Sequence, residues 1–301
     1  MKSKFFFSVL SVVVAGICLT SCANSGSSTP DEEIPSNESE FVFADSSQST
    51  SNDYPTEIQK TDSWEFQYSS EAGGIIITEC LCANKRSDDI KASKDTDIVV
   101  PDSFDGFDGV KVVGIGARAF FNRIMKSLTL PDTITSIGKN AFNSADIADT
   151  LIIPNSVTSI GEEAFKNYWG EAVVLPPLEA IGGRMFMDAN VKKVTLSEGT
   201  KVLTNLAFYD CMSLTDLDLP NSIEEISENS LTILSSKLSS ITLPDNLKTF
   251  DISGLPLVEY THYPVVTFKN KTYDFPAAYN VSKEDMKNLA DELQSAINSN
   301  T

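Results

Sequence analysis

Residues 128–142 read LTLPDTITSIGKNAF and residues 151–165 read LIIPNSVTSIGEEAF, and a looser copy runs from Val173 to Phe186. Similarity of a chain to itself at a fixed period of about 20 to 50 residues is typical of stacked structural units. Two apolar columns and a proline column keep this register along the chain. They are Phe120, Phe142, Phe165, Phe186, Phe208 and Leu231; Ile115, Ile137, Ile160, Ile181, Leu203 and Ile226; and Pro101, Pro131, Pro154, Pro176, Pro220 and Pro244, with Ser197 in the gap.

Each unit has a physical interpretation. A strand such as residues 128–130 directs its outer residues inward and its middle residue outward, and proline ends the strand by removing a hydrogen-bond donor. We expect a second extended piece at residues 135–137, a backbone relaxed by Gly138, and a helical turn that places Phe142 inside. Stacking buries the columns, and each large side chain contributes roughly 1.5 to 3 kcal/mol. The prediction is a β-rich (α+β) solenoid built as a right-handed stack of coils.

The recurring phrase L-x-x-I-P-x-x-V-x-x-I-G-x-x-A-F resembles the BspA-like leucine-rich repeats of bacterial surface lipoproteins. The resemblance runs from about Trp64 to Leu257. It implies leucine-rich repeats at residues 111–257 and a β-rich N-terminal cap at residues 58–110. Units five and six depart from the pattern, at Ser197 in place of proline and at Leu231 in place of phenylalanine. We expect looser packing in those two units.

The segment 258–301 is expected to close the array. Residues 265–275 alternate as a hairpin turning at Asn270, and a helix beginning at Ser282 places apolar residues on one side. Those residues are Met286, Leu289, Ala290, Leu293 and Ile297. Because the open end of a solenoid needs a cover with a polar outer face, we expect the helix to be a C-terminal cap.

The first residues carry an export signal. Lys2 and Lys4 precede an apolar run, and residues 19–22 read LTSC, which resembles the bacterial lipobox. The resemblance implies that a signal peptide, residues 1–21, is removed and that Cys22 is lipidated. Residues 22–57 are rich in Ser, Thr, Asp and Glu, and we expect a disordered tether that holds the body on the order of 30 Å from the lipid. The expected location is the bacterial envelope, anchored in the outer membrane and exposed at the surface.

Three cysteines remain for the body: Cys80, Cys82 and Cys211. An odd number permits at most one bridge. If residues 78–82 form one strand, the first two cysteines lie nearly 7 Å apart, which is too far for good disulfide geometry. We therefore expect no disulfide scaffold, and Cys211 is interpreted as a packed thiol.

The composition argues against several functions. A formal charge of −19 opposes nucleic-acid binding, because phosphates require clustered Lys and Arg. Gly114, Gly116 and Ala119 match a relaxed dinucleotide motif, but the same phrase recurs in later units and is the repeat itself. His262 is the single histidine, and the sequence lacks Gly-x-Ser-x-Gly, His-Glu-x-x-His and Cys-x-x-Cys. We expect no catalytic residue, no cofactor and no enzymatic activity.

Three groups of residues are candidates for binding. The period-2 rule turns one side chain of each short strand outward, and a flat stripe of this kind can receive a partner, although ordinary strand propensity also explains it. The stripe comprises Val99, Thr129, Ile152, Val174, Thr195, Asp218 and Thr242. Tyr168 and Trp169 form a candidate aromatic contact, with a place at the edge of the core as the alternative. A weak calcium candidate is the acidic loop of Asp102, Asp105 and Asp108, with a solvated turn as the alternative.

The resemblance implies a surface module that binds a protein or glycan ligand, while the lipid anchor would supply the contact with the membrane. The alternative function is a structural or nutrient-uptake accessory of the bacterial envelope. The sequence identifies neither the ligand nor the face that receives it.

Overall fold

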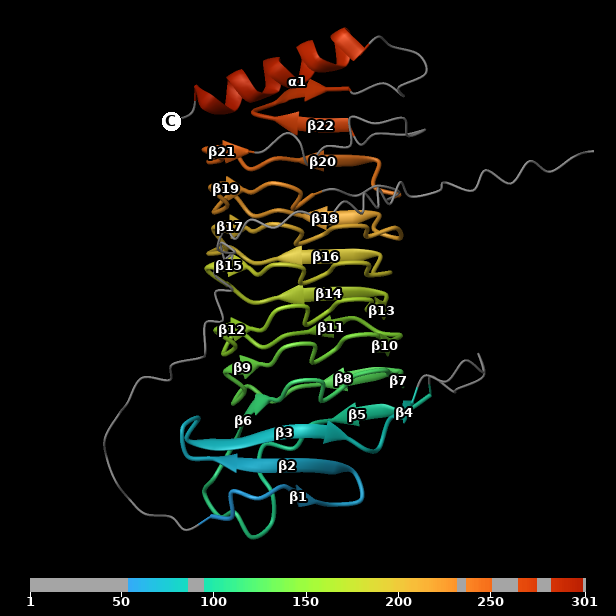
Figure 1. Ribbon diagram of the computed structural model, residues 1–301, viewed down its shortest axis with the longest axis vertical. Helices are drawn as coiled ribbons and strands as arrows, with labels where there is room; N and C mark the ends of the chain where they lie inside the picture. The colour runs from blue at the N-terminus through green and yellow to red at the C-terminus, as the bar shows by residue number, and fades with distance from the viewer. Residues whose placement is uncertain (1–53, 86–94, 232–236, 251–264, 275–282, 300–301) are drawn as a thin grey trace, which may run out of the picture. The chain divides into compact units, whose positions relative to one another are not determined.

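The computed structural model describes residues 54–85, 95–231, 237–250, 265–274 and 283–299 (Figure 1). The expected signal peptide, Cys22, most of the expected tether and His262 lie outside these ranges. Within the described residues, no helix is long and apolar enough to cross a membrane.

The body is a β-solenoid in which each coil contributes short strands to the sides of the stack. On the first of these sides, each coil contributes one short strand. These strands pair in parallel as two groups, β5 with β8, and β11-β14-β16-β18. Their bounds are β5 (Asp97–Val99), β8 (Ser127–Thr129), β11 (Leu151–Ile152), β14 (Ala172–Leu175), β16 (Lys193–Leu196) and β18 (Asp216–Asp218). We call this surface the strand face; Figure 1 shows its strands following one another along the stack.

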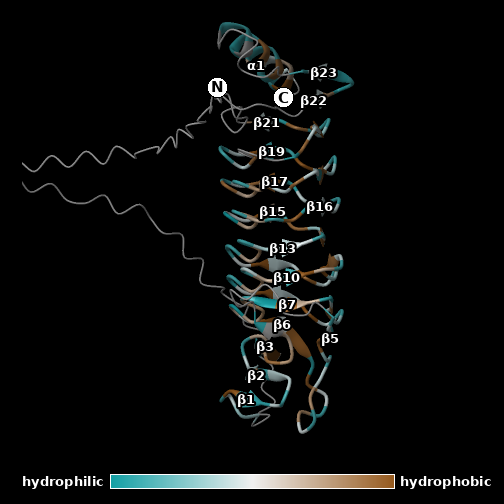
Figure 2. Ribbon diagram, turned by 90° about the vertical axis from the view of Figure 1, so that its right-hand side faces the viewer, coloured by the Kyte–Doolittle hydropathy of each residue, from teal (hydrophilic) through white to brown (hydrophobic). Residues whose placement is uncertain are grey.

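Two further sets of strands complete the coils. The second face follows the Ile column and is built from β6 (Val112–Ile115), β9 (Ser136–Ile137), β12 (Ser159–Ile160), β15 (Ala180–Ile181), β17 (Val202–Leu203), β19 (Glu225–Ile226) and β21 (Thr249–Phe250). The third edge pairs β4 (Asn84–Lys85), β7 (Arg123–Met125), β10 (Asp146–Ile147) and β13 (Trp169–Gly170). Figure 2 shows the resulting coils lying above one another from β6 to β21.

A column of aromatic rings runs through the centre of the stack. Consecutive rings from Phe120 to Phe208 are nearly parallel, with centroids 5.2, 5.2, 5.0 and 5.2 Å apart. All five phenylalanine rings are fully buried, and Leu231 continues the column with 4% exposure. Offset stacking at this separation is a favoured geometry for aromatic pairs. The Phe column predicted from the repeat is therefore the core.

The segment that carries the Phe column is not the helical turn expected from the sequence. It is a run of tight turns with two left-handed residues in each of the first five units. These residues are Arg118 and Asn122, Asn140 and Ser144, Glu163 and Asn167, Arg184 and Asp188, and Leu206 and Asp210. The backbone amides of these turns alternate between two kinds of partner. The amide of Phe142 donates to the carbonyl of Ala164 in the next coil at 2.8 Å, whereas that of Ala141 donates to the carbonyl of Gly138, three residues back, at 3.2 Å. The Phe residues thus sit in a hydrogen-bonded ladder of their own.

The glycine after the Ile column has a different role from the one expected. Gly138 and Gly161 do not have positive φ angles. A Cβ on Gly138 would lie 2.6 Å from the amide nitrogen of Ala117 in the preceding coil, and one on Gly161 would lie 2.5 Å from that of Lys139. Glycine is needed there because neighbouring backbones approach too closely for any side chain.

This close approach ends at unit four. A Cβ on Gly182 would meet nothing nearer than the Met185 Cε at 3.9 Å, and the ladder of the second face is interrupted between β12 and β15. Unit five replaces the glycine with Thr204, whose Oγ1 donates a hydrogen bond to the carbonyl of Ile181 (2.8 Å). Units four and five are nevertheless paired through β15 and β17, so the interruption of this face lies between units three and four.

The N-terminal end is covered by an antiparallel sheet. β1 (Gln59–Lys60) pairs with β2 (Trp64–Ser69), which pairs with β3 (Gly74–Cys80). β3 then pairs in parallel with β6, and the Trp64 ring meets the first ring of the Phe column at 6.1 Å. The β-rich N-terminal cap expected from the sequence is confirmed.

The C-terminal hairpin and helix are also confirmed. β22 (Val265–Phe268) pairs with β20 (Ser240–Thr242) and with β23 (Lys271–Tyr273). Between β22 and β23, Lys269 and Asn270 have φ angles of 47° and 63°, as a two-residue hairpin turn requires. Helix α1 (Lys283–Asn298) has a buried side formed by Ala290, Leu293 and Ile297.

Gly138→Ala and Gly182→Ala form a matched test of the glycine column. We expect Gly138→Ala to lower the free energy of unfolding by about 1 to 3 kcal/mol, because the new methyl group meets backbone atoms that must move. Gly182→Ala should change the same quantity by less than about 1 kcal/mol, because its Cβ has room. Urea unfolding followed by circular dichroism measures both. Equal effects of the two substitutions would contradict the packing argument.

Candidate partner-binding surface

The strand face alternates between buried and outward side chains, as predicted. Leu151 and Val173 point into the core, whereas Ile152 is 62% exposed and Val174 is partly exposed. Ile152 lies beside Val174, which lies beside Thr195 on the next strand. The outward stripe comprises Val99, Thr129, Ile152, Val174, Thr195, Asp218 and Thr242. These side chains therefore lie one per coil along the strand face, and the strand ladder is interrupted between β8 and β11 and between β18 and β20.

The stripe changes from apolar to charged along the stack. Asp218 accepts a hydrogen bond from the Thr195 Oγ1 (3.1 Å) and pairs with the Lys193 Nζ (2.9 Å). The hydrogen bond and the charge of Asp218 raise the pKa of Lys193, so its ammonium is retained. Upstream, Val99 and Ile152 are 64% and 62% exposed, among the most exposed large apolar residues of the described chain. The apolar pair of Ile152 and Val174 thus borders a charged end on the same sheet, while Val99 lies on the separate sheet of β5 and β8.

The structure separates the two members of the expected aromatic contact. Tyr168 is fully buried, so it offers nothing to a partner, and the expectation is corrected for this residue. Its ring packs edge-on against Phe165 at 5.7 Å, and burial raises the pKa of its hydroxyl. Trp169, 40% exposed, remains at the surface. The position of Tyr168 is explained by Gly170, whose missing side chain leaves room for the ring.

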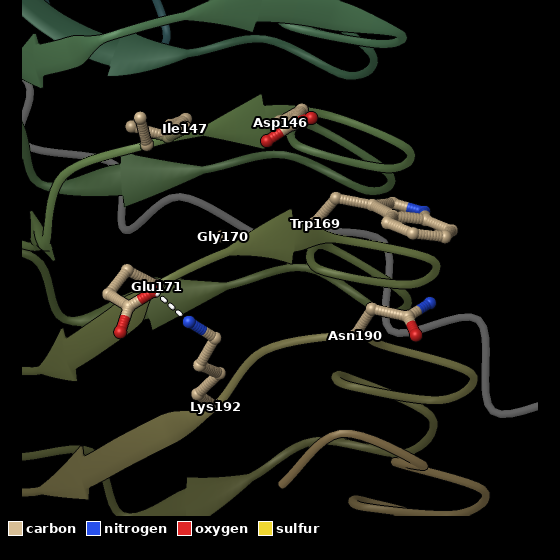
Figure 3. Close-up of a pocket in the computed structure, with 8 residues that line it drawn as sticks. Asp146, Ile147, Trp169, Gly170, Glu171, Asn190 and Lys192 are labelled. Atoms are coloured by element: carbon tan, nitrogen blue, oxygen red, sulfur yellow. Dashed lines mark hydrogen bonds and ion pairs between the residues drawn. The ribbon is translucent and has the colours of Figure 1, made fainter. Parts of the chain in front are cut away.

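A hollow that sequence reasoning missed lies beside Trp169 on the third edge (Figure 3). Its volume is about 320 Å³. It is lined by Asp146, Ile147, Ala148, Trp169, Gly170, Glu171, Asn190 and Lys192. The Lys192 Nζ and the Glu171 Oε2 form an ion pair at 2.6 Å across one side. The signal in the sequence was the run Tyr168-Trp169-Gly170, which interrupts the pattern of its sister units.

The acidic loop does not assemble a calcium site. Asp102 pairs with the Lys111 Nζ at 2.9 Å and accepts a hydrogen bond from Ser103. These contacts, chiefly the one with Lys111, lower the pKa of the Asp102 carboxyl. Among the residues that the structure describes, no three His, Cys, Asp or Glu side chains form a group able to hold a metal ion. Asp102, Asp105 and Asp108 are thus a solvated turn, and the calcium expectation is corrected.

The three cysteines of the body are free thiols. Because β3 ends at Cys80, the chain leaves the extended conformation there, and the Sγ atoms of Cys80 and Cys82 lie 3.5 Å apart. The continuous strand over residues 78–82 on which the expected spacing depended is therefore not formed. Cys211 is fully buried and donates a hydrogen bond to the carbonyl of Phe186 (3.0 Å), as a packed thiol. Burial raises the pKa of the Cys211 thiol. The pKa of the Cys80 thiol is raised to about 12, chiefly by burial and to a smaller extent by the neighbouring Cys82.

Comparison with known families identifies the repeated units. The profile of the BspA type Leucine rich repeat region matches residues 110–175 and 170–255, with six copies. The solenoid of this chain belongs to the BspA-type leucine-rich repeats. Proteins built from leucine-rich repeats generally act as binding modules for protein partners rather than as enzymes. No curated protein sequence matches this chain.

Comparison with solved structures finds bacterial leucine-rich-repeat proteins among the matches. A leucine rich cell surface protein from Faecalibacterium prausnitzii is 22% identical, with 75% of this chain and 60% of that chain covered and a TM-score of 0.45. A protein from Eubacterium ventriosum is 18% identical, with 60% and 46% covered and a TM-score of 0.45. The leucine rich repeat protein of T. pallidum is 20% identical, with 77% and 96% covered and a TM-score of 0.39. The match thus spans 60% and 46% of the first two proteins.

Thiol labelling tests the packing of the cysteines. In the native protein we expect iodoacetamide to modify the partly exposed Cys82 and to leave Cys211 unmodified, because access and thiolate formation both control the reaction. Peptide mass spectrometry before and after unfolding in guanidinium measures the modification at each site. Rapid native modification of Cys211 would contradict its placement in the core.

Proposed function

We propose that this chain is a surface-displayed module that binds a protein partner through the strand face. The observation that carries the proposal is Ile152, which is 62% exposed in the middle of a regular sheet and lies beside Val174. Contiguous apolar surface rimmed by polar groups is typical of interaction sites. Ile152 and Val174 would form the apolar centre, and Lys193 and Asp218 the polar rim.

The rigidity of the sheet supports this assignment. Each strand of the face is hydrogen-bonded to a neighbour, and the side chain behind each outward residue is locked in the core, as Leu151 and Val173 are. A surface that is ordered before binding loses little conformational entropy when the partner arrives. The stripe repeats about every 4.8 Å along the stack, so it suits a partner with an extended, complementary surface.

The proposed location follows from the N-terminal sequence. Cys22 would carry the lipid after removal of residues 1–21, and residues 22–57 would separate the repeats from the outer membrane. The membrane contact would then be made by the lipid alone. The formal charge of −19 disfavours nucleic acid as the partner, and a host protein or a protein of another microbe is the partner class that we propose.

The double variant Ile152→Lys with Val174→Lys tests the strand face. Partners are first sought by pull-down with host matrix proteins and with the organism's own envelope proteins. For the partner found, we expect the double variant to weaken binding by at least about tenfold, because two lysines place unpaired charge in an apolar contact. The dissociation constant from biolayer interferometry and the melting temperature are measured on the same samples.

The matched control is Thr158→Lys with Ala180→Lys, which adds the same charge to exposed positions on the second face. This control should bind as the unmodified protein does. Binding that survives the Ile152 and Val174 substitutions would refute the strand-face site. Recovery of envelope proteins alone, in every pull-down, would favour the accessory role over adhesion.

Lipidation is tested separately. Cells that express the chain are grown with an alkyne-bearing fatty acid, and we expect the purified protein to carry the label because Cys22 would be acylated. Cys22→Ser should abolish the label and release the protein from the membrane fraction. Cys18→Ser, four residues upstream, is the control and should leave both unchanged. Equal labelling of the Cys22 variant and the unmodified protein would rule out this anchor.

A further inference from the structure

The hollow beside Trp169 is bounded by two rows of three residues each, of which Asp146 is largely buried, at 9% exposure, and the other five are partly or fully exposed. Trp169 lies between Asp146 and Asn190, and Glu171 lies between Ala148 and Lys192 (Figure 3). The register is fixed by strand pairing of Asp146 with Trp169 and by the amide of Asn190, which donates to the carbonyl of Tyr168 (2.7 Å). Gly170 separates the two rows without a side chain of its own. The walls of the hollow are therefore held by the backbone of three consecutive coils.

Unit three departs from its sister units at three successive residues, and these residues shape the hollow. Where Tyr168-Trp169-Gly170 stands, the sister units carry Arg123-Ile124-Met125, Ala145-Asp146-Ile147 and Ala189-Asn190-Val191. The Tyr168 ring fills the interior that Met125, Ile147 or Val191 fills elsewhere. A Cβ on Gly170 would lie 2.3 Å from the Tyr168 Cε1, so tyrosine and glycine require each other. The exposed indole is thus part of a coordinated local rearrangement.

Stability gives no reason for this rearrangement. The Tyr168 hydroxyl is buried, and among the described residues it has no hydrogen-bond partner. A buried polar group without a partner costs free energy that an apolar residue at this position would not. Trp169 meanwhile exposes 40% of its surface. A local cost that produces an exposed aromatic wall is expected at a functional site.

We propose that this hollow binds one pyranose residue of a glycan, with the ring of the sugar against the Trp169 indole. The proposal rests on the proposed surface display, but its contacts are distinct from those of the strand face. The apolar face of a pyranose, with its slightly positive C–H groups, matches the negative face of an indole. A volume of about 320 Å³ lies at the small end of ligand sites and suits one sugar residue.

The polar groups around the indole favour a sugar over a cation. Asp146 and Glu171 accept hydrogen bonds, Lys192 donates them, and the amide of Asn190 does both. Vicinal hydroxyls need this mixture, because each hydroxyl donates and accepts. The carboxylate of Glu171 is neutralised by Lys192 at 2.6 Å, which weakens the attraction for a free ammonium group. The Asn190 Oδ1 accepts from the Ser213 Oγ (3.3 Å), which holds its amide in place.

Binding is tested with the purified protein on an array of defined glycans, followed by calorimetric titration of the best glycan. We expect binding to at least one neutral glycan and a loss of at least about tenfold with Trp169→Ala. Trp169→Phe, which keeps an aromatic ring, should retain part of the affinity.

Fluorescence gives an independent signal because the chain has two tryptophans and the other, Trp64, is 6% exposed. Glycan should shift the emission of the unmodified protein and leave that of Trp169→Phe unchanged.

The controls separate this proposal from the protein-binding function. The Ile152→Lys with Val174→Lys double variant should keep its glycan affinity, because neither residue lines the hollow. Tetramethylammonium is the probe for a cation site, and binding of this cation, detected by Trp169 fluorescence, without binding of any glycan would overturn the proposal. An array without signal, or glycan binding that Trp169→Ala leaves intact, would overturn it as well. Loss of protein binding in the double variant with glycan binding retained would support both sites.

Discussion

The structure depends on the spacing imposed by the Phe column. Rings stacked at 5.0 to 5.2 Å set a coil separation close to that of hydrogen-bonded strands, so aromatic packing and backbone pairing are satisfied together. The tight turns that carry the rings direct their own amides to the next coil. Where the backbones approach most closely, as at Gly138 and Gly161, even a methyl group does not fit.

The same regularity gives the exposed surface its character. Because every coil repeats its neighbour, one outward side chain per strand becomes a straight row, and Ile152 and Val174 lie side by side without any long-range design. Residues that differ from the repeat pattern are therefore easy to identify by comparison with the neighbouring units. In unit three, Tyr168 is buried in the core, Gly170 has no side chain where Ile147 and Val191 stand in the neighbouring units, and Trp169 lies at the surface and lines a hollow. Two surfaces of different chemistry thus arise from one scaffold.

Features that depend on neighbouring residues in the sequence were predicted correctly, whereas features that depend on contacts between coils were not. The Phe and Ile columns, the alternation on the strand face, the hairpin turn at Asn270 and the buried side of α1 follow from periodicity and turn chemistry, and the structure agrees with them. The helical turn was wrong because left-handed residues break the segment into tight turns, in which every second amide bonds to the next coil. The continuous strand over residues 78–82 was wrong because β3 ends at Cys80.

By itself, the sequence determined that the chain forms stacked repeats with a cap at each end, because a periodic pattern leaves each unit unable to bury its columns alone. Three features became clear only in the folded chain. Trp169, and not Tyr168, faces outward, and Asp102 pairs with Lys111 instead of gathering with Asp105 and Asp108. The backbone of the neighbouring coil requires glycine at position 138. These outcomes depend on contacts between coils, as for Gly138, on a contact across a loop, as between Asp102 and Lys111, or on the competition between neighbouring side chains for one space. A linear pattern specifies neither.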